Sequence, residues 1–349
     1  MLRYKLFGKG TGLRVSEISL GCGMFGTRWG HGASPEEARR MFEGYIEAGG
    51  NFFDTADTYQ RGESESLLGE FSVGRREDLV IATKFSQGSG ESGSVSRTGN
   101  SRKNMVRSLE DSLRRLKTDY VDIYWAHLSD ETTSVDEIMR GFDDLTRAGK
   151  ILYPGLSNFP AWRAARAATL ASIRGSVPLA GVQLEYSLVE RTPEHDVLPM
   201  ARAFGLGAVA WSPLGGGLLT GKYRRGETGR RDTWKNLIHE EKSEKISSIL
   251  DALDAVGEET NSNPGRVALS WIAHKGVIPI IGPRTREQLD DNLAAASLHL
   301  SDEQVRRLDE ASAVRAGFPH SFYTRFPGAR LSLRGGAPGR VEDSTVEAL

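Results

Sequence analysis

The chain has 349 residues, of which 38% are hydrophobic and 26% charged, and its 45 basic and 46 acidic residues give a net charge of −1 at pH 7. This balance is typical of a soluble globular protein and does not favour a nucleic-acid or membrane-surface partner. No apolar run is long enough to span a bilayer, the N-terminus lacks the apolar core of a signal peptide, and one cysteine cannot form an intrachain disulfide. We therefore expect a cytoplasmic protein.

The first predicted element is a β-hairpin over residues 3–18, whose turn is rich in glycine and which we expect to close the bottom of a barrel. Eight short β-rich apolar runs are predicted strands, at residues 17–21, 51–56, 79–84, 121–127, 151–157, 181–186, 207–212 and 277–282. Amphipathic runs alternate with them, and the run at 34–50 has an N-cap at Ser34 and Pro35 in its first turn. This alternation predicts an α/β fold, a single (β/α)8 TIM barrel over residues 1–327, followed by a loosely packed C-terminal extension at 328–349.

A doubly wound dinucleotide-binding fold is the alternative. Gly21, Gly23 and Gly26 have the spacing of the dinucleotide fingerprint after a predicted strand, and Asp54 ends the next strand, where the ribose-binding acid would stand. Residues 27–33, however, intervene before the helix cap at Ser34, so the last glycine does not begin a helix. We therefore interpret these glycines as the first loop of a barrel.

Four polar residues of different chemistry stand at or just after predicted strand ends: Asp54, Tyr59, Lys84 and His127. Taken singly, Asp54 and Lys84 are best explained as a structural ion pair, Tyr59 as an aromatic residue at the rim, and His127 as a core histidine. The carboxyl ends of parallel barrel strands open onto one face, where such residues converge. Together, at three successive strands, they predict an active site.

The chemistry of these residues suits reduction of a carbonyl group by hydride. The alkoxide that forms needs a proton donor, and Tyr59, with an ordinary pKa of about 10, is protonated at neutral pH. An ammonium at Lys84 would lower that pKa, and Asp54 would keep Lys84 charged and in place. His127 would donate a hydrogen bond to the carbonyl oxygen and orient the substrate.

Several ordered motifs resemble those of the aldo-keto reductases, and the resemblance covers residues 3–325. The motifs are DTADTYQRGESESLLG at 54–69, residues 108–158 with SLEDSLRRLKTDYVDIYWAH and GKILYPGLSN, Gln183 in GVQLEYS, WSPLGGGLLTGKY at 211–223, and IPIIGPRTREQLDDNL at 278–293. The resemblance implies a (β/α)8 barrel that uses NADPH without a metal. It also implies that Asp54, Tyr59, Lys84 and His127 perform the roles given above.

Expected cofactor contacts lie at the ends of the later strands. The glycines at 215–217 let backbone amides approach a pyrophosphate, Trp211 would stack on the nicotinamide, and Arg284 next to a helix start would hold a 2′-phosphate in bidentate fashion. Turn formation and loop capping are the alternative explanations for these glycines and for Ser157 and Asn158. With the resemblance, the expected set is Gly23, Met24, Asp54, Ser157, Asn158, Gln183, Trp211, Ser212, Pro213, Leu214, Gly215, Gly217, Lys222, Gly282, Arg284, Gln288 and Asn292.

Some features depart from the family pattern or interrupt the alternation of strands and helices. Met24 follows Gly23 in place of the usual threonine, Pro154 lies within the fifth strand, and Pro283 precedes Arg284. The glycine- and serine-rich segment 86–101 either borders the substrate pocket or is a connector. The resemblance implies that the charged insertion 221–243 folds over the cofactor, which its position favours over the alternative of a solvated loop surface. Candidate pocket walls are Trp29, Phe85, Trp125, Phe159 and the stretch 317–326, although large apolar residues near strand ends are more often packing residues.

Two other functions use the same residues. A barrel of this fold can bind NADPH and serve as a regulatory subunit, as the potassium-channel β subunits do, but such a module does not require all four polar residues. An aldolase or isomerase could use Lys84 as an imine-forming nucleophile, which would require a neutral amine. The sequence therefore predicts an NADPH-dependent oxidoreductase whose partner is a small-molecule aldehyde or ketone.

Overall fold

The computed structural model describes residues 1–88, 94–227, 229, 239–326, 328 and 332. Eight parallel strands close into a barrel in the order β10-β3-β4-β5-β6-β7-β8-β9. Their bounds are β3 Ser19–Gly21, β4 Phe52–Asp54, β5 Val80–Phe85, β6 Val121–Ala126, β7 Ile151–Ser157, β8 Gly181–Glu185, β9 Gly207–Trp211 and β10 Ile278–Ile281. All eight predicted strands are confirmed, and the doubly wound alternative is wrong because the sheet closes on itself.

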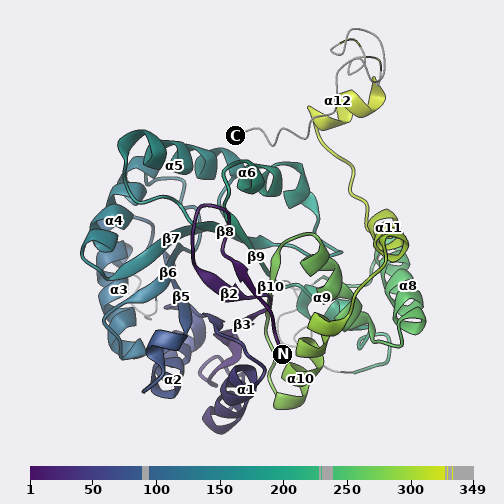
Figure 1. Cartoon of the computed structure of the whole chain (residues 1–349), viewed down its shortest axis with the longest axis horizontal. Helices are drawn as coiled ribbons and strands as arrows, with labels where there is room; N and C mark the ends of the chain where they lie inside the picture. Colours follow the sequence, from purple (N-terminus) through teal and green to yellow (C-terminus); the bar gives the residue numbers. More distant parts are fainter. Residues whose placement is uncertain (89–93, 228, 230–238, 327, 329–331, 333–349) are drawn as a thin grey trace.

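Helices form a ring around the barrel (Figure 1). Their bounds are α1 Pro35–Glu47, α2 Glu63–Phe71, α3 Arg102–Leu116, α4 Val135–Arg147, α5 Ala161–Arg174, α6 Val197–Ala203, α8 Glu244–Glu259, α9 Pro264–His274, α10 Arg286–Leu293, α11 Asp302–Ala311 and α12 His320–Arg325. As predicted, the Ser34 hydroxyl accepts a hydrogen bond from the backbone of Glu37 and caps α1, with Pro35 in the first turn. The short 3-10 turn η1, Cys22–Met24, contains Gly23, and residues 27–34 separate Gly26 from the start of α1, so the last of these glycines begins no helix.

The predicted hairpin is present and closes the end of the barrel where the strands begin. Its strands, β1 Tyr4–Leu6 and β2 Arg14–Ser16, pair antiparallel, and the hairpin crosses the barrel opening in Figure 1. The ring of Phe7 enters the barrel, where it meets Phe52 and Trp125 edge-on at centroid distances of 5.9 and 6.2 Å. A Cβ at Gly181 would come within 2.6 Å of the Phe7 ring, so a glycine there makes room for it.

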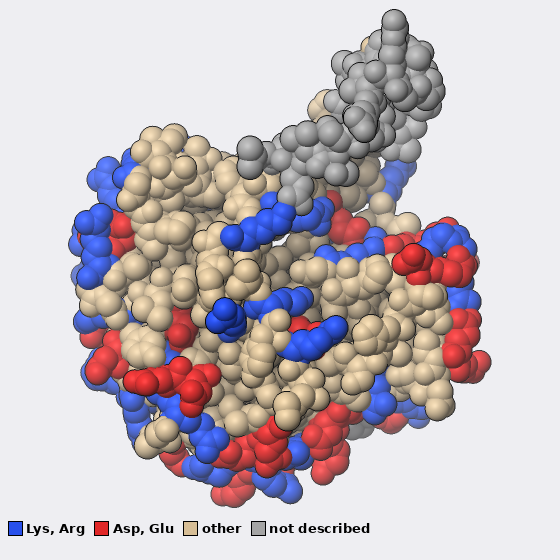
Figure 2. Space-filling view, viewed as in Figure 1, with Lys and Arg blue, Asp and Glu red and all other residues tan. Residues whose placement is uncertain are grey.

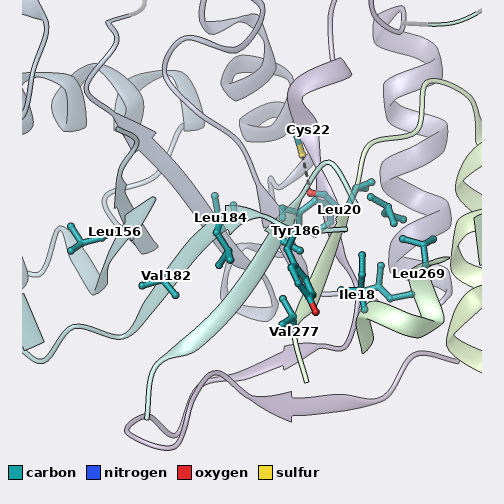
Figure 3. Close-up of a cluster of buried hydrophobic side chains, with 14 of the residues drawn as sticks. Ile18, Leu20, Cys22, Leu156, Val182, Leu184, Tyr186, Leu269 and Val277 are labelled. Atoms are coloured by element: carbon teal, nitrogen blue, oxygen red, sulfur yellow. Dashed lines mark hydrogen bonds between the residues drawn. The ribbon is translucent and has the colours of Figure 1, made fainter. Parts of the chain in front are cut away.

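The core has two layers, because successive side chains of a strand point alternately into and out of the barrel. The inner layer fills the barrel with Phe7, Val15, Phe52, Val80, Ala82, Ile123, Trp125, Ala180, Val209, Ile278 and Ile280. The larger outer layer lies between strands and helices, and Figure 3 shows Val182 and Leu184 of β8 within it together with Leu269 of α9. The side chains of both layers are buried.

Pro154 lies within a regular strand, and two of the expected pocket walls lie in the core. Pro154 does not interrupt β7, which stays in register with β6 and places Pro154 opposite Tyr124. Phe85 and Trp125 are packing residues and not pocket walls, because both are fully buried, Phe85 stacked on Tyr124 at 5.0 Å and Trp125 inside the barrel.

The C-terminal part leaves the barrel after α11. Figure 1 shows α12 outside the ring of helices, and Phe318, Phe322 and Phe326 are exposed, so these three rings of the stretch 317–326 do not wall the barrel mouth as expected. The predicted extension at 328–349 lies outside the described residues except for residues 328 and 332.

The surface carries charges of both signs. On the face that bears the hairpin, Lys and Arg side chains gather near the centre, while basic and acidic side chains mix along the rim (Figure 2). Within the described ranges, no helix is both long and apolar enough to cross a membrane.

Candidate active site

The fold brings the four predicted residues together at the carboxyl ends of the strands. Asp54 ends β4, Lys84 lies near the end of β5, His127 follows β6, and Tyr59 begins the 3-10 turn η2, Tyr59–Gly62. The Lys84 ammonium donates to the Asp54 carboxylate, to the carbonyl oxygen of Thr55 at 2.8 Å and to the Tyr59 hydroxyl at 3.2 Å. The rings of Tyr59 and His127 meet edge-on with centroids 5.9 Å apart.

The ion pair of Lys84 and Asp54 is buried, with both residues at most 2% exposed. Burial works against charge on Lys84, but the Asp54 carboxylate and the Tyr59 phenol outweigh it and raise the pKa of the Lys84 ammonium. Burial also raises the pKa of Asp54, while Lys84 and Gln183 oppose that rise. The charged form of Lys84 is therefore the one that faces the Tyr59 hydroxyl.

His127 is an uncharged histidine. Burial, assisted by the charge of Lys84, lowers the pKa of His127 to about 3. Its ring is therefore neutral at physiological pH and carries a single N–H donor. The Nδ1 atom is buried and has no hydrogen-bond partner within the described ranges. The ring thus retains hydrogen-bonding capacity that the surrounding protein does not use.

Three polar residues that sequence reasoning did not select hold this site in shape. The His127 backbone N–H donates to the Ser86 hydroxyl at 3.0 Å, and Ser86 donates to Asn100 at 2.6 Å, so both ends of segment 86–101 are anchored beside His127. Residues 89–93 of that segment lie outside the described residues, which leaves its contact with substrate a prediction. The buried Gln60 amide donates to the carbonyl oxygens of Gly23 and His31 at 3.2 and 2.9 Å.

The first barrel loop lies against Tyr59. A Cβ at Gly23 would be 3.6 Å from the Tyr59 ring, and Trp29 meets that ring edge-on at 6.0 Å. The Trp29 backbone N–H donates to Gln60 at 2.8 Å, which ties the loop to η2. The Met24 side chain of this loop is buried.

The polar residues at the ends of β7 and β8 are linked to the first four. The Gln183 amide donates to the second oxygen of Asp54 at 2.8 Å. The Asn158 amide donates to the His127 carbonyl oxygen and to the Ser157 hydroxyl, at 2.9 and 3.0 Å, and accepts from the Trp211 indole at 2.9 Å. Asn158 has a φ of 57°, a left-handed conformation that asparagine tolerates better than most residues. These contacts extend the site across five adjacent strands, β4 to β8, and reach Trp211 on β9.

The glycine-rich segment after β9 forms the 3-10 turn η6, Gly215–Thr220, and we call the segment from Ser212 to Gly217 the glycine cradle. Ser212 and the glycines at 215, 216 and 217 all have φ between 53° and 94°, and Pro213 and Leu214 lie between them. A Cβ at Gly217 would be 2.7 Å from the Lys222 side chain, and the Tyr223 hydroxyl donates to the Gly216 carbonyl oxygen at 3.0 Å. The backbone N–H groups of Gly215 and Gly217 donate within the turn, to Ser212 and Leu214 at 2.9 and 3.0 Å. The Lys222 side chain beside the turn supplies a positive charge that suits an anionic group such as a pyrophosphate.

A second cationic position lies at the start of α10. Arg284 follows Gly282 and Pro283, and its backbone N–H donates to the Gln288 side chain at 2.9 Å. The Arg284 guanidinium lies 3.4 Å from the His31 ring nitrogen of the first loop. Asn292 is buried one turn further along the helix. The lysine beside the glycine cradle and the arginine at this helix N-terminus suit the anionic groups of a nicotinamide dinucleotide, and the half-buried Trp211 offers a ring for stacking.

The insertion at 221–243 returns to the barrel mouth. His239 lies 3.1 Å from the Glu185 carboxylate at the end of β8, and that hydrogen bond raises the pKa of His239. Residues 228 and 230–238 lie outside the described residues, so the expected fold of this insertion over the cofactor remains a prediction.

Comparison with known proteins agrees with this geometry. A sequence model of the Aldo/keto reductase family matches residues 17–313. Norsolorinic acid reductase of Aspergillus flavus is 34% identical over 93% of this chain and 84% of its own length. The aryl-alcohol dehydrogenase [NADP(+)] of Phanerodontia chrysosporium is 34% identical over 92% of this chain and 89% of its own length. The uncharacterized oxidoreductase YrpG of Bacillus subtilis is 38% identical over 88% and 95%, respectively. From its sequence and its barrel, this chain belongs to the aldo/keto reductase family.

Proposed function

We propose that this protein is an NADPH-dependent reductase that converts an aromatic aldehyde or ketone to the alcohol, and that it catalyses the reverse oxidation. The observation that carries the proposal is the hydrogen bond of 3.2 Å between the Lys84 ammonium and the Tyr59 hydroxyl at the mouth of the barrel. The aromatic substrate class is supported by the name of the aryl-alcohol dehydrogenase above and by Trp29, which lies at the edge of the Tyr59 ring.

Tyr59 is the proposed proton donor. When its phenol gives a proton to the developing alkoxide, the phenolate left behind lies beside a fixed ammonium, and Lys84 stabilises it without needing to move. Asp54 holds that ammonium in place and charged, and Gln183 holds Asp54.

His127 is the proposed orienting residue. Because its ring is neutral, it polarises the carbonyl oxygen by a hydrogen bond and does not compete with Tyr59 as an acid. Ser86 and Asn158 both bond the His127 backbone, which fixes where the ring stands.

The cofactor is proposed to lie across the ends of β7 to β10. Trp211 would stack on the nicotinamide, the backbone of the glycines at 215–217 with Lys222 would hold the pyrophosphate, and Arg284 would hold the 2′-phosphate, with Gln288 and Asn292 at the adenosine. Bound NADPH supplies the hydride that the carbonyl carbon accepts. The arginine favours NADPH over NADH, since only the former carries a 2′-phosphate.

Imine chemistry at Lys84 is disfavoured. A nucleophilic amine must be neutral, whereas the ion pair with Asp54 keeps Lys84 charged. A purely regulatory NADPH-binding role would leave the Tyr59–Lys84 hydrogen bond without a purpose, and the test below separates it from catalysis.

The decisive experiment replaces Tyr59 with phenylalanine, which keeps the ring and removes the proton donor. NADPH oxidation with benzaldehyde as substrate is expected to fall by about 10²- to 10⁴-fold, because a positioned general acid contributes that much to rate. NADPH binding, followed by fluorescence, is expected to stay within a few fold of the unaltered protein. Undiminished turnover by Tyr59→Phe would contradict the assignment. NADPH binding without turnover by either protein across aromatic aldehydes, ketones and quinones would favour the regulatory role.

A further inference from the structure

Asp57 is a buried acid beside the active site that the proposed mechanism does not use. It lies in the turn between β4 and η2, is 1% exposed, and its backbone N–H donates to the Lys84 carbonyl oxygen at 3.1 Å. Both side-chain oxygens are buried and have no hydrogen-bond partner within the described ranges. Since a buried carboxylate without a partner is costly, the protonated form is the favoured one.

The charges that face Asp57 are already balanced without it. Glu65 of α2 accepts from the Arg115 guanidinium of α3 at 2.7 Å and from the Thr83 hydroxyl of β5 at 2.5 Å. On the other side, Lys84 is paired with Asp54. A further titratable neighbour is the buried phenol of Tyr124 on β6, which donates to the Met105 carbonyl oxygen at 3.0 Å.

This balance explains the titration of Asp57. Burial, with a smaller contribution from the Glu65 charge, raises the pKa of Asp57 to about 8, while Arg115, the nearby backbone N–H of Thr58 and Lys84 oppose the rise only in part. The set of Asp54, Lys84, Glu65 and Arg115 is neutral as two ion pairs. An ionised Asp57 therefore adds one uncompensated negative charge to the buried region that holds these two ion pairs.

We propose that Asp57 is a positioning residue that acts through Lys84, staying uncharged while Tyr59 cycles its proton and opposing the ionisation of Tyr59 once it is itself ionised. This role of Asp57 rests on the proposed function only because that function makes Tyr59 the proton donor. A phenolate at Tyr59 and a carboxylate at Asp57 would draw on the same Lys84 charge, so forming either makes the other less favourable. An ionised Asp57 therefore keeps Tyr59 protonated, which favours carbonyl reduction over alcohol oxidation.

The test follows the ionisation of Tyr59 directly. Tyrosinate absorbance is titrated in the full-length protein and in Tyr59→Phe, and the difference between the two curves reports Tyr59 alone. The same pair is measured with Asp57→Asn and with Asp57→Leu, an apolar side chain that suits a position where no hydrogen bond is lost. We expect the Tyr59 midpoint to fall by about one pH unit in both backgrounds, the size of a like-charge effect on a neighbouring site. The pH profile of benzyl alcohol oxidation by NADP+ is expected to shift in the same direction.

A matched control is Asp122→Asn. Asp122 is also a buried acid with a raised pKa, but it lies near the start of β6, where it accepts from Arg76 at 2.7 Å and from the Ile81 backbone at 2.9 Å. Its removal is expected to leave the Tyr59 midpoint unchanged. Coincident Tyr59 midpoints with and without the Asp57 carboxyl would overturn the inference, even if turnover is normal. A shifted midpoint in a protein that oxidises no alcohol would support the inference while contradicting the proposed function.

Discussion

The Lys84 ammonium lies 3.2 Å from the Tyr59 hydroxyl oxygen and 4.7 Å from the centroid of the Tyr59 ring. These residues come from different elements, β5 and η2, and the Lys84 side chain is fully buried. A fixed positive charge so close to a phenol stabilises the phenolate, and burial prevents water from screening the charge.

Lys84→Met tests that relationship. Methionine fills a similar volume without charge, so we expect carbonyl reduction to fall by about 10²- to 10⁴-fold. The Asp54 carboxylate would lose its cation, and the free energy of unfolding is expected to drop by about 3–5 kcal/mol. Turnover and denaturant unfolding measure the two effects.

The double variant Asp54→Asn with Lys84→Met is the control for stability. It removes both charges, so it is expected to recover most of the lost stability but none of the activity. A double variant as unstable as Lys84→Met would show that the loss comes from packing and not from an unpaired carboxylate.

The lowered pKa of His127 predicts how the free energy of unfolding depends on pH. Its pKa in the folded protein, about 3, is below the ordinary value near 6.5 that the unfolded chain has. A group with a lowered folded pKa contributes stability above its unfolded pKa and loses it as pH falls toward the folded value. His127→Asn is therefore expected to lose less stability than the unaltered protein between about pH 6.5 and about pH 3. Thermal unfolding across that range measures the difference, and parallel curves for both proteins would contradict the neutral histidine.

Arg284→Gln tests the choice of nucleotide. A charged hydrogen bond contributes about 1.5–3 kcal/mol, so the Kd for NADPH is expected to rise by about 10- to 100-fold while the Kd for NADH changes little. The control is Arg286→Gln, two residues further on, because Arg286 is paired with Asp290 and Glu47. Equal weakening of NADPH and NADH by Arg284→Gln would place the 2′-phosphate elsewhere.

Gly217→Ala tests the glycine cradle. Gly217 has a φ of 94°, and a Cβ there would collide with Lys222, so we expect weaker NADPH binding together with a loss of stability of about 1–3 kcal/mol. Gly226→Ala is the matched control, since Gly226 has a φ of 75° but open space around its Cβ position. Gly226→Ala is expected to lose only the stability that a left-handed backbone conformation costs an alanine. Equal NADPH affinity in the two variants would show that Gly217 is not part of the proposed pyrophosphate site. Fluorescence titration with NADPH gives both affinities.

Local pattern was enough to predict the barrel. Each strand is a short apolar run of the right length, and residues 34–50 carry their own cap and stop signals, which is why Ser34 and Pro35 begin α1 as expected. The strand-end positions of Asp54, Lys84 and His127 follow from the same pattern, because parallel strands of a barrel end on one face. Glycine spacing alone is not sufficient evidence for a dinucleotide-binding fold. Gly21, Gly23 and Gly26 have the spacing of the dinucleotide fingerprint, but the chain forms the short turn η1 there and no helix begins at Gly26.

The expected pocket walls were harder to assign from sequence. Phe85 and Trp125 stand near strand ends, as candidate walls should, yet both are buried in the core layers. One residue of shift along a strand exchanges the barrel interior for its exterior, and sequence does not reveal which neighbour closes over an aromatic ring.

The amino-acid sequence by itself determined the alternation of strands and helices, the aldo/keto reductase family and the four polar residues at the strand ends. Only the tertiary structure decided which side chains contact one another: that Gln183 holds Asp54, that Ser86 and Asn158 fix His127, and that the buried Asp57 carboxyl has no hydrogen-bond partner among the residues that the structure describes. The physical reason is that strand and helix patterns depend on neighbours a few residues apart. Hydrogen bonding and burial at the barrel mouth depend on residues tens of positions apart, which meet only when the sheet closes.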